Sequence, residues 1–213
     1  MKIAPAFLLV YTAAISMLAL PATAGETQVD CGQFRLDVKA SQSLPGAGGK
    51  VAGGQCSTHM SNGYPLPDPN CTPGAINPSV TQEKLRNPAF TTKCLRDNAT
   101  TKAQKATTYQ SYGIQHPAHN TGASQICELD HLISLELGGA DTLDNIWPQC
   151  GPDEVVLMER YFKQKDTVEN YLASQVRAGA MLLDEAQKGI ATDWTQYIDA
   201  AKSCRPPSCR NGK

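Results

Sequence analysis

The sequence lacks three features, and each absence excludes a class of structure or partner. Its 8 cysteines never form a Cys-x-x-Cys pair, which argues against a structural zinc site. Its formal net charge of −1 is not the strong basic excess of most nucleic-acid-binding domains, so any attraction for phosphate must come from a local patch or a bound cation. Beyond residue 20 no long apolar run occurs, so no membrane-spanning helix is predicted there.

The first residues have the pattern of a secretory signal peptide. Lys2 precedes the apolar run 6–20, Pro21 interrupts it, and Ala22-Thr23-Ala24 has the small residues of a cleavage site. The run is shorter than the roughly 20 residues that span a bilayer, although an uncleaved anchor is the alternative. We therefore predict a signal peptide at 1–24, cleavage near Ala24, a secreted or periplasmic protein, and no stable membrane association.

All 8 cysteines follow this segment, and an even number in an exported chain predicts disulfides. Spacing alone does not determine the connectivity. The simplest expectation pairs neighbours in the sequence: Cys31 with Cys56, Cys71 with Cys94, Cys127 with Cys150, and Cys204 with Cys209.

The composition divides the mature chain into three parts. Residues 25–70 are rich in Gly, Ser and Pro and predict a loop-rich segment, with weak strand alternation only over 34–38. Residues 71–203 form the predicted main domain, and 204–213 a cysteine-containing tail. Short helices are expected from Thr81 to near Pro88 and over 102–112. The stretch 71–125 is locally basic, which fits either phosphate contacts or a solvated face; its cations are Lys84, Arg86, Lys93, Arg96, Lys102 and Lys105.

The second half of the chain predicts a hairpin followed by two helices. The segment 126–150 reads as two strands joined by a turn at Gly138-Gly139. A first helix is expected to start at Pro152 and to end at Gly179. A second helix is expected to bury one apolar face, made by Leu182, Ala186, Ile190, Trp194, Ile198 and Ala201.

Asp130 and His131 carry the chemistry that the sequence suggests. Neighbouring side chains on a strand point to opposite faces, so both reach one pocket only where the strand twists or ends. A carboxylate suits a hard cation such as Mg²⁺, and a neutral imidazole can accept a proton from water near pH 7. A lone His is more often structural, but Asn145 follows His131 by 14 residues, a spacing that returns the chain to the end of the first strand.

This segment resembles the HNH, or His-Me finger, nucleases. It is similar to a group of exported or phage-associated bacterial proteins with the signature DHLIPLELGG…NLWPQ, which here reads DHLISLELGG…NIWPQ, and the resemblance extends over roughly 66–195. It implies an α+β fold with a ββα-metal finger, flanking helices and a disulfide-tied N-terminal region. It also implies a general base at His131, a metal ligand at Asp130, a positioning residue at Asn145, and one divalent cation.

Other assignments follow from the resemblance with more alternatives open. No His follows His131 to supply a further metal ligand; the acidic candidates are Glu154, Glu159, Asp166 and Glu169. Asp166 is favoured because Lys165-Asp166 matches the group, although an exposed helix face explains this segment equally well. Lys165, Arg96 and Lys102 are candidate phosphate contacts, and Glu128 a candidate supporting group beside the metal. Ser134 and Cys150 depart from the signature without touching this chemistry.

The sequence therefore predicts a metal-dependent endonuclease acting on DNA, with RNA left open as a substrate. Mg²⁺ is the favoured ion, and Mn²⁺ and Zn²⁺ remain alternatives. A disulfide-stapled binding module that keeps the fold without activity is a second hypothesis, motivated by the missing ligand and the net negative charge. A metal hydrolase of small phosphodiesters is a third.

Overall fold

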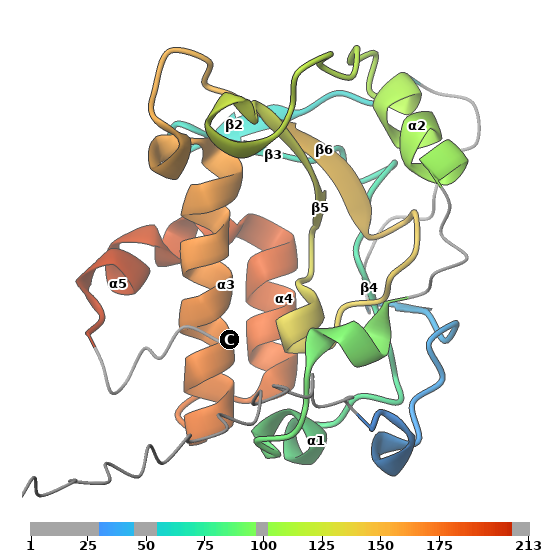
Figure 1. Cartoon of the computed structure of the whole chain (residues 1–213). Coiled ribbons are helices and arrows are strands. Elements are labelled where there is room, and N and C mark those ends of the chain that lie inside the picture. The colour runs from blue at the N-terminus through green and yellow to red at the C-terminus, as the bar shows by residue number, and fades with distance from the viewer. Residues whose placement is uncertain (1–29, 45–54, 97–101, 206–213) are drawn as a thin grey trace, which may run out of the picture.

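The computed structural model describes residues 30–44, 55–96 and 102–205, with the side chains of 102–105 omitted, and has an α+β fold (Figure 1). The signal-peptide prediction lies outside these residues. Helices surround three two-stranded antiparallel sheets, β1–β4, β2–β3 and β5–β6. In the described part of the chain, no helix is both long and apolar enough to cross a membrane. The strands are β1 Gln42–Ser43, β2 His59–Ser61, β3 Tyr64–Leu66, β4 Ala75–Ile76, β5 Cys127–His131 and β6 Ile146–Cys150; the α-helices are α1 Gln82–Arg86, α2 Lys102–Ser111, α3 Tyr161–Ala178, α4 Leu183–Asp193 and α5 Ile198–Ser203.

The expected hairpin is formed by β5 and β6. Its register pairs Cys127 with Cys150 at the open end and His131 with Ile146 at the loop end. The Cys127–Cys150 disulfide joins the open end, which confirms this expected pair. The first strand stops at His131, and the apolar residues after it leave the sheet for a 3-10 turn, η4 Leu135–Leu137.

The loop of this hairpin depends on its two glycines. Gly138 ends η4 with a positive φ of 73°, a conformation that glycine adopts without strain. A Cβ on Gly139 would lie 1.8 Å from the carbonyl oxygen of Ile133, so the backbone packs where a side chain would be. The Gly-Gly pair thus shapes a compact loop instead of the tight two-residue turn that its position suggested.

Helix α3 runs along the hairpin and contacts β5, β6, η4, α1, α4 and α5 (Figure 1). Its end at Gly179, with a positive φ of 78°, confirms the prediction. Its expected start at Pro152 is wrong, because the chain loops before Tyr161. In that loop the Arg160 side chain donates to the carbonyl of Pro152, and the Tyr161 N–H donates to the carbonyl of Gly151.

The main core lies between α3, α4, α5 and the hairpin loop. The predicted second helix is split into α4, a 3-10 turn (η6 Trp194–Tyr197) and α5, which together bury most of the expected apolar face. Leu182 is the exception, since it is exposed just before α4. Buried core residues include Ile133, Leu135, Leu137, Val168, Leu172, Val176, Ala186, Ile190, Trp194 and Ile198.

The disulfides of the N-terminal part differ from the expected pairs. Cys31 is bonded to Cys94, and Cys56 to Cys71. The prediction from sequence proximity was wrong because the folded chain brings the turn that carries Cys94 beside Cys31, 63 residues earlier in the sequence. The expected Cys204–Cys209 bond lies outside the described residues, because Cys209 is not among them.

The smaller elements follow the sequence in most places. Helix α1 begins after Thr81, whose side chain accepts from the N–H of Lys84, and α2 occupies the range expected for it. The weak strand expected over 34–38 is wrong. Gly32–Phe34 is a 3-10 turn, and Arg35 adopts a left-handed conformation that a strand does not allow.

Gly139→Ala is expected to lower the free energy of unfolding by more than about 3 kcal/mol, because the new methyl group meets backbone atoms that cannot rotate away. Gly63→Ala is the matched control: nothing lies within 4 Å of its added Cβ, so only its positive φ costs energy, about 1 kcal/mol. Urea unfolding of both variants measures the difference. Equal losses would contradict the assigned packing.

Candidate functional site

A polar cleft of about 280 Å³ lies where β5 ends beside α3 and η4. Six of the candidate site residues that the sequence singled out line it together. Its polar lining residues include Arg96, Glu128, Asp130, His131, Glu136, Asp166, Glu169 and Asn170. Asp130 and His131 both reach this cleft because the strand ends at His131, the condition under which adjacent side chains can share a pocket.

His131 is held by a carboxylate that the sequence did not suggest. Its Nε2 lies 2.8 Å from Oδ1 of Asp141, and only 13% of its side chain is exposed. Among the described residues no hydrogen bond to Nδ1 is present, so this nitrogen remains available to a ligand. Because a carboxylate accepts, Asp141 favours a proton on Nε2 and leaves the lone pair on Nδ1.

Lys165 lies beneath the cleft and is wholly buried. Its Nζ donates to the carbonyl oxygen of His131 at 2.7 Å, lies 2.8 Å from Oδ2 of Asp130, and donates to Oε1 of Glu169. The prediction that Lys165 contacts phosphate is therefore wrong: its ammonium group is paired with two carboxylates inside the protein. Burial alone lowers the pKa of Lys165, but Asp130 and Glu169 outweigh it and raise this pKa above the ordinary value.

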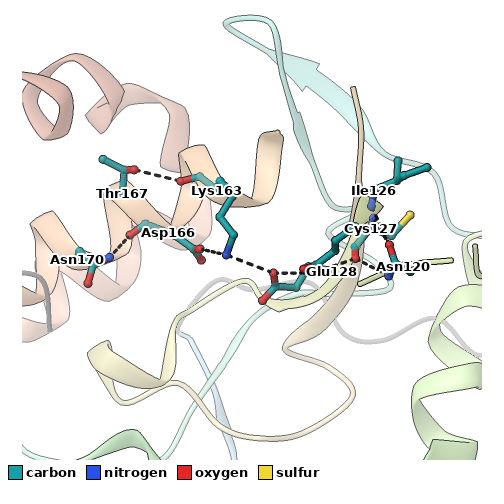
Figure 2. A network of polar contacts seen from close by, with 9 residues as sticks. Asn120, Ile126, Cys127, Glu128, Lys163, Asp166, Thr167 and Asn170 are labelled. Carbon is teal, nitrogen blue, oxygen red and sulfur yellow. Dashed lines mark hydrogen bonds and ion pairs between the residues drawn. The ribbon is translucent and has the colours of Figure 1, made fainter. Parts of the chain in front are cut away.

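A second lysine links the strand to the helix at the surface (Figure 2). Lys163 Nζ donates to Oδ2 of Asp166 at 2.7 Å and lies 4.0 Å from Oε2 of Glu128. The start of β5 is also fixed there, because the Asn120 side chain accepts from the N–H of Cys127 at 2.9 Å and donates to its carbonyl at 2.7 Å. The predicted residues Glu128 and Asp166 are thus neighbours across the strand and the helix.

Asn145 lies outside the cleft, with no exposed surface. Its Nδ2 donates to the carbonyls of Ile133 and Ala140, both at 2.9 Å, and its Oδ1 accepts from the N–H of Ile133 at 2.9 Å. Its side chain therefore fastens the two ends of the hairpin loop together. Among the described residues this side chain makes no hydrogen bond to His131, and it binds instead the backbone two residues further along the chain.

The cleft concentrates carboxylates that disfavour one another's ionisation. Burial raises the pKa of Glu128, and the charges of Asp166 and Asp130 raise it further. Burial raises the pKa of Glu169 well above its ordinary value, although Lys165 opposes this. The pKa of Asp130 is also raised, chiefly by burial. Such a cluster attracts cations, and its oxygen atoms suit a hard cation.

The remaining predicted site residues lie in different places. Arg96 lines the cleft and is exposed, whereas the side chain of Lys102 is outside the described part of the structure. Glu154 and Glu159 precede α3 and are exposed, so the structure does not bring them to the site. Sequence reasoning missed Asp141, Glu136 and Asn170. The spacing of Asn170 from Asp166, one helical turn, is the one signal that could have found it.

Comparison with known proteins found no significant match. No family model matches the chain, and no curated protein or solved structure is significantly similar to it.

Lys165→Met is expected to lower the free energy of unfolding by about 3–5 kcal/mol, because it leaves Asp130 and Glu169 buried without their cation. Lys163→Met, two residues earlier, is the matched control. Lys163 is partly exposed, so its loss is expected to cost under about 1 kcal/mol. Chemical denaturation followed by circular dichroism compares the two variants. Similar small losses would show that the buried ammonium group does not hold the helix to the strand.

Proposed function

We propose that the chain is an exported, metal-dependent endonuclease of the HNH type, with His131 as its general base. The observation that carries this proposal is the pair formed by His131 and Asp141 at the rim of a cleft lined by acidic groups. An imidazole oriented by a carboxylate is the arrangement that general-base catalysis uses to activate water. The substrate we propose is DNA, with RNA as the alternative.

The arrangement of β5, β6 and α3 supports the finer fold assignment. Two antiparallel strands are followed by a helix that packs on them, as in a ββα finger, and the base lies at the end of the first strand. The three disulfides whose cysteines both lie among the described residues support export to an oxidising compartment, the periplasm or the outside of the cell.

The donor groups of the cleft fit one hard divalent cation. Within the described residues no group of three or more His, Cys, Asp or Glu side chains is placed to hold a metal ion. Mg²⁺ is commonly bound by one or two carboxylates together with water and substrate phosphates, so it does not need such a cage. Asp130 and Asp166 are the proposed ligands, with Asn170 beside them in the same cleft. Mn²⁺ and Zn²⁺ remain alternatives.

The chain's own residues divide the reaction between them. His131 accepts a proton from a water molecule through Nδ1, while Asp141 holds Nε2 and stabilises the imidazolium that forms. The oxygen of that water bonds to phosphorus as the bond to the leaving oxygen breaks. A bound divalent cation would polarise the phosphate and stabilise the charge on the leaving oxygen. Lys165 keeps Asp130 and the end of β5 in place from below.

A binding module without activity is a second candidate, and one observation favours it. The ammonium group of Lys165 already neutralises an oxygen of Asp130, the principal predicted metal ligand. If this ion pair excludes the metal, the fold persists without catalysis. Calorimetric titration of the wild-type protein with Mg²⁺ or Mn²⁺ separates the candidates, since the module binds neither ion at this site.

His131→Ala is expected to abolish plasmid nicking under non-reducing conditions, with unchanged circular dichroism. Asp141→Asn is expected to reduce the rate about 10–100-fold, because the amide no longer accepts from a protonated imidazole as strongly. His59→Ala is the control, since His59 is exposed on β2 away from the cleft. Nicking by His131→Ala at the wild-type rate would rule out the proposed base.

Chelation with EDTA is expected to stop nicking, and Mg²⁺ in excess to restore it. Asp130→Asn is expected to weaken Mn²⁺ binding at least about tenfold, because it removes a proposed ligand charge. Asp184→Asn on α4 is the control, because its carboxylate is exposed and pairs only with Lys188 in the described structure. Persistent nicking in EDTA would contradict the metal requirement.

A further inference from the structure

A second pocket, of about 380 Å³, adjoins the acidic cleft. It is formed by the end of α1, the segment after it, and the last turn of α3. Thr92 and Glu136 line both pockets, so the two hollows are adjacent. Its lining residues are Leu85, Arg86, Asn87, Pro88, Phe90, Thr91, Thr92, Lys93, Glu136 and Arg177.

This second pocket has the opposite charge to the cleft. Arg86, Lys93 and Arg177 line it, and no carboxylate in the described part of the chain forms an ion pair with any of them. Glu136, at the boundary, is the single carboxylate among the described lining residues. Three cations against one carboxylate leave the pocket positive and suited to an anion.

A contact between α1 and α3 holds one of these cations in place. Arg86 Nε donates to the carbonyl oxygen of Val176 at 3.5 Å, next to Arg177 in the last turn of α3. Gln82 binds the same carbonyl oxygen through its Nε2 at 3.2 Å. Arg86 and Arg177 therefore lie at the packed ends of two helices, and Lys93 lies in the 3-10 turn Thr92–Leu95.

Apolar side chains complete the lining. Leu85, Pro88 and Phe90 share the pocket with the three cations. Phe90 is oriented by Phe34, with ring centroids 5.4 Å apart and an interplanar angle of 78°. A basic rim beside an aromatic ring suits a nucleotide, whose phosphate is anionic and whose base has two flat apolar faces. A volume of this size falls in the range of small-ligand pockets.

We propose that this pocket binds one unpaired nucleotide next to the phosphate that is cut. The inference rests on the proposed function and adds to it a substrate class, single-stranded or locally unpaired nucleic acid. The phosphate of that nucleotide contacts Arg86, Lys93 and Arg177, and its base packs on Phe90. A paired base cannot enter, because both its faces are covered by stacking and its edge by its partner.

The experiment measures binding separately from cleavage. The full-length, disulfide-bonded protein carries His131→Ala, so the probe stays intact. The probe is a fluorescein-labelled single-stranded octanucleotide of mixed sequence, compared with the same sequence in a hairpin duplex, and fluorescence anisotropy gives Kd over a range of salt concentrations. Lys93→Gln and Arg86→Gln test the charges, and Phe90→Leu tests stacking while keeping an apolar side chain.

Lys202→Gln is the matched control. Lys202 lies beside Tyr64, whose ring packs on Tyr161 at the start of α3, whereas Arg177 lies at the other end of that helix. We expect Lys93→Gln and Arg86→Gln to weaken single-strand binding roughly tenfold each and to lower the salt slope by about 0.7 per lost contact. Phe90→Leu is expected to weaken it at least about fivefold, and Lys202→Gln to leave it unchanged.

Two results overturn the proposal. The first is that Lys93→Gln and Phe90→Leu bind the single strand with the same Kd as Lys202→Gln. The second is that the duplex binds as tightly as the single strand and that the substitutions weaken both equally. Nicking by the wild-type protein is scored in parallel. Nicking with unaffected binding overturns the nucleotide pocket alone, whereas binding losses without nicking overturn the proposed activity and leave the pocket supported.

Discussion

The buried ammonium group of Lys165 is the interaction on which the geometry of the site depends. A lysine with no exposed surface requires partners for its charge, and its partners come from both sides of one contact: Asp130 and the His131 carbonyl on β5, and Glu169 on α3. Moving the helix away from the strand would separate the ammonium group from Asp130 and from the His131 carbonyl, and only Glu169, on the same helix, would remain its partner. The separation between strand end and helix is therefore fixed, and with it the cleft that they line.

The hairpin loop fixes the other side of the cleft by a different means. The Asn145 side chain supplies hydrogen bonds to the carbonyls of Ile133 and Ala140 in the loop backbone. Gly139 packs directly against Ile133, so these backbone groups lie close enough for one side chain to bind both. The same loop carries Asp141 to the imidazole of His131. The motif thus has two roles: Gly138, Gly139 and Asn145 determine the shape of the loop, and five of its other residues line the cleft, namely Asp130, His131, Ser134, Leu135 and Glu136. A motif of this kind specifies a precise position for one imidazole.

Local sequence patterns predicted the elements whose formation depends on neighbouring residues. The hairpin, the ends of α1 and α2, and the Gly179 end of α3 followed from spacing, caps and glycine. The start of α3 was not predicted correctly. A hydrogen bond from the Tyr161 N–H to the Gly151 carbonyl closes a loop where Pro152 suggested a helix. Disulfide pairing, the burial of Lys165 and the role of Asp141 depend on segments that meet only in the folded chain. A lysine beside an aspartate on a helix ordinarily indicates a face exposed to solvent. Lys165 is buried instead because it contacts Asp130 and the His131 carbonyl on β5.

The opposite charges of the adjoining pockets explain how a chain with a net charge of −1 could attract a polyanion. The acidic cleft alone repels phosphate, whereas the pocket of Arg86, Lys93 and Arg177 attracts it. The two hollows are adjacent, so a strand held in the second, as we propose, would bring its next phosphate toward the first. A cation among the carboxylates would remove the repulsion there, and the phosphate would supply oxygen ligands that the cleft lacks. Cation and strand would then each strengthen the binding of the other, as thermodynamic linkage requires.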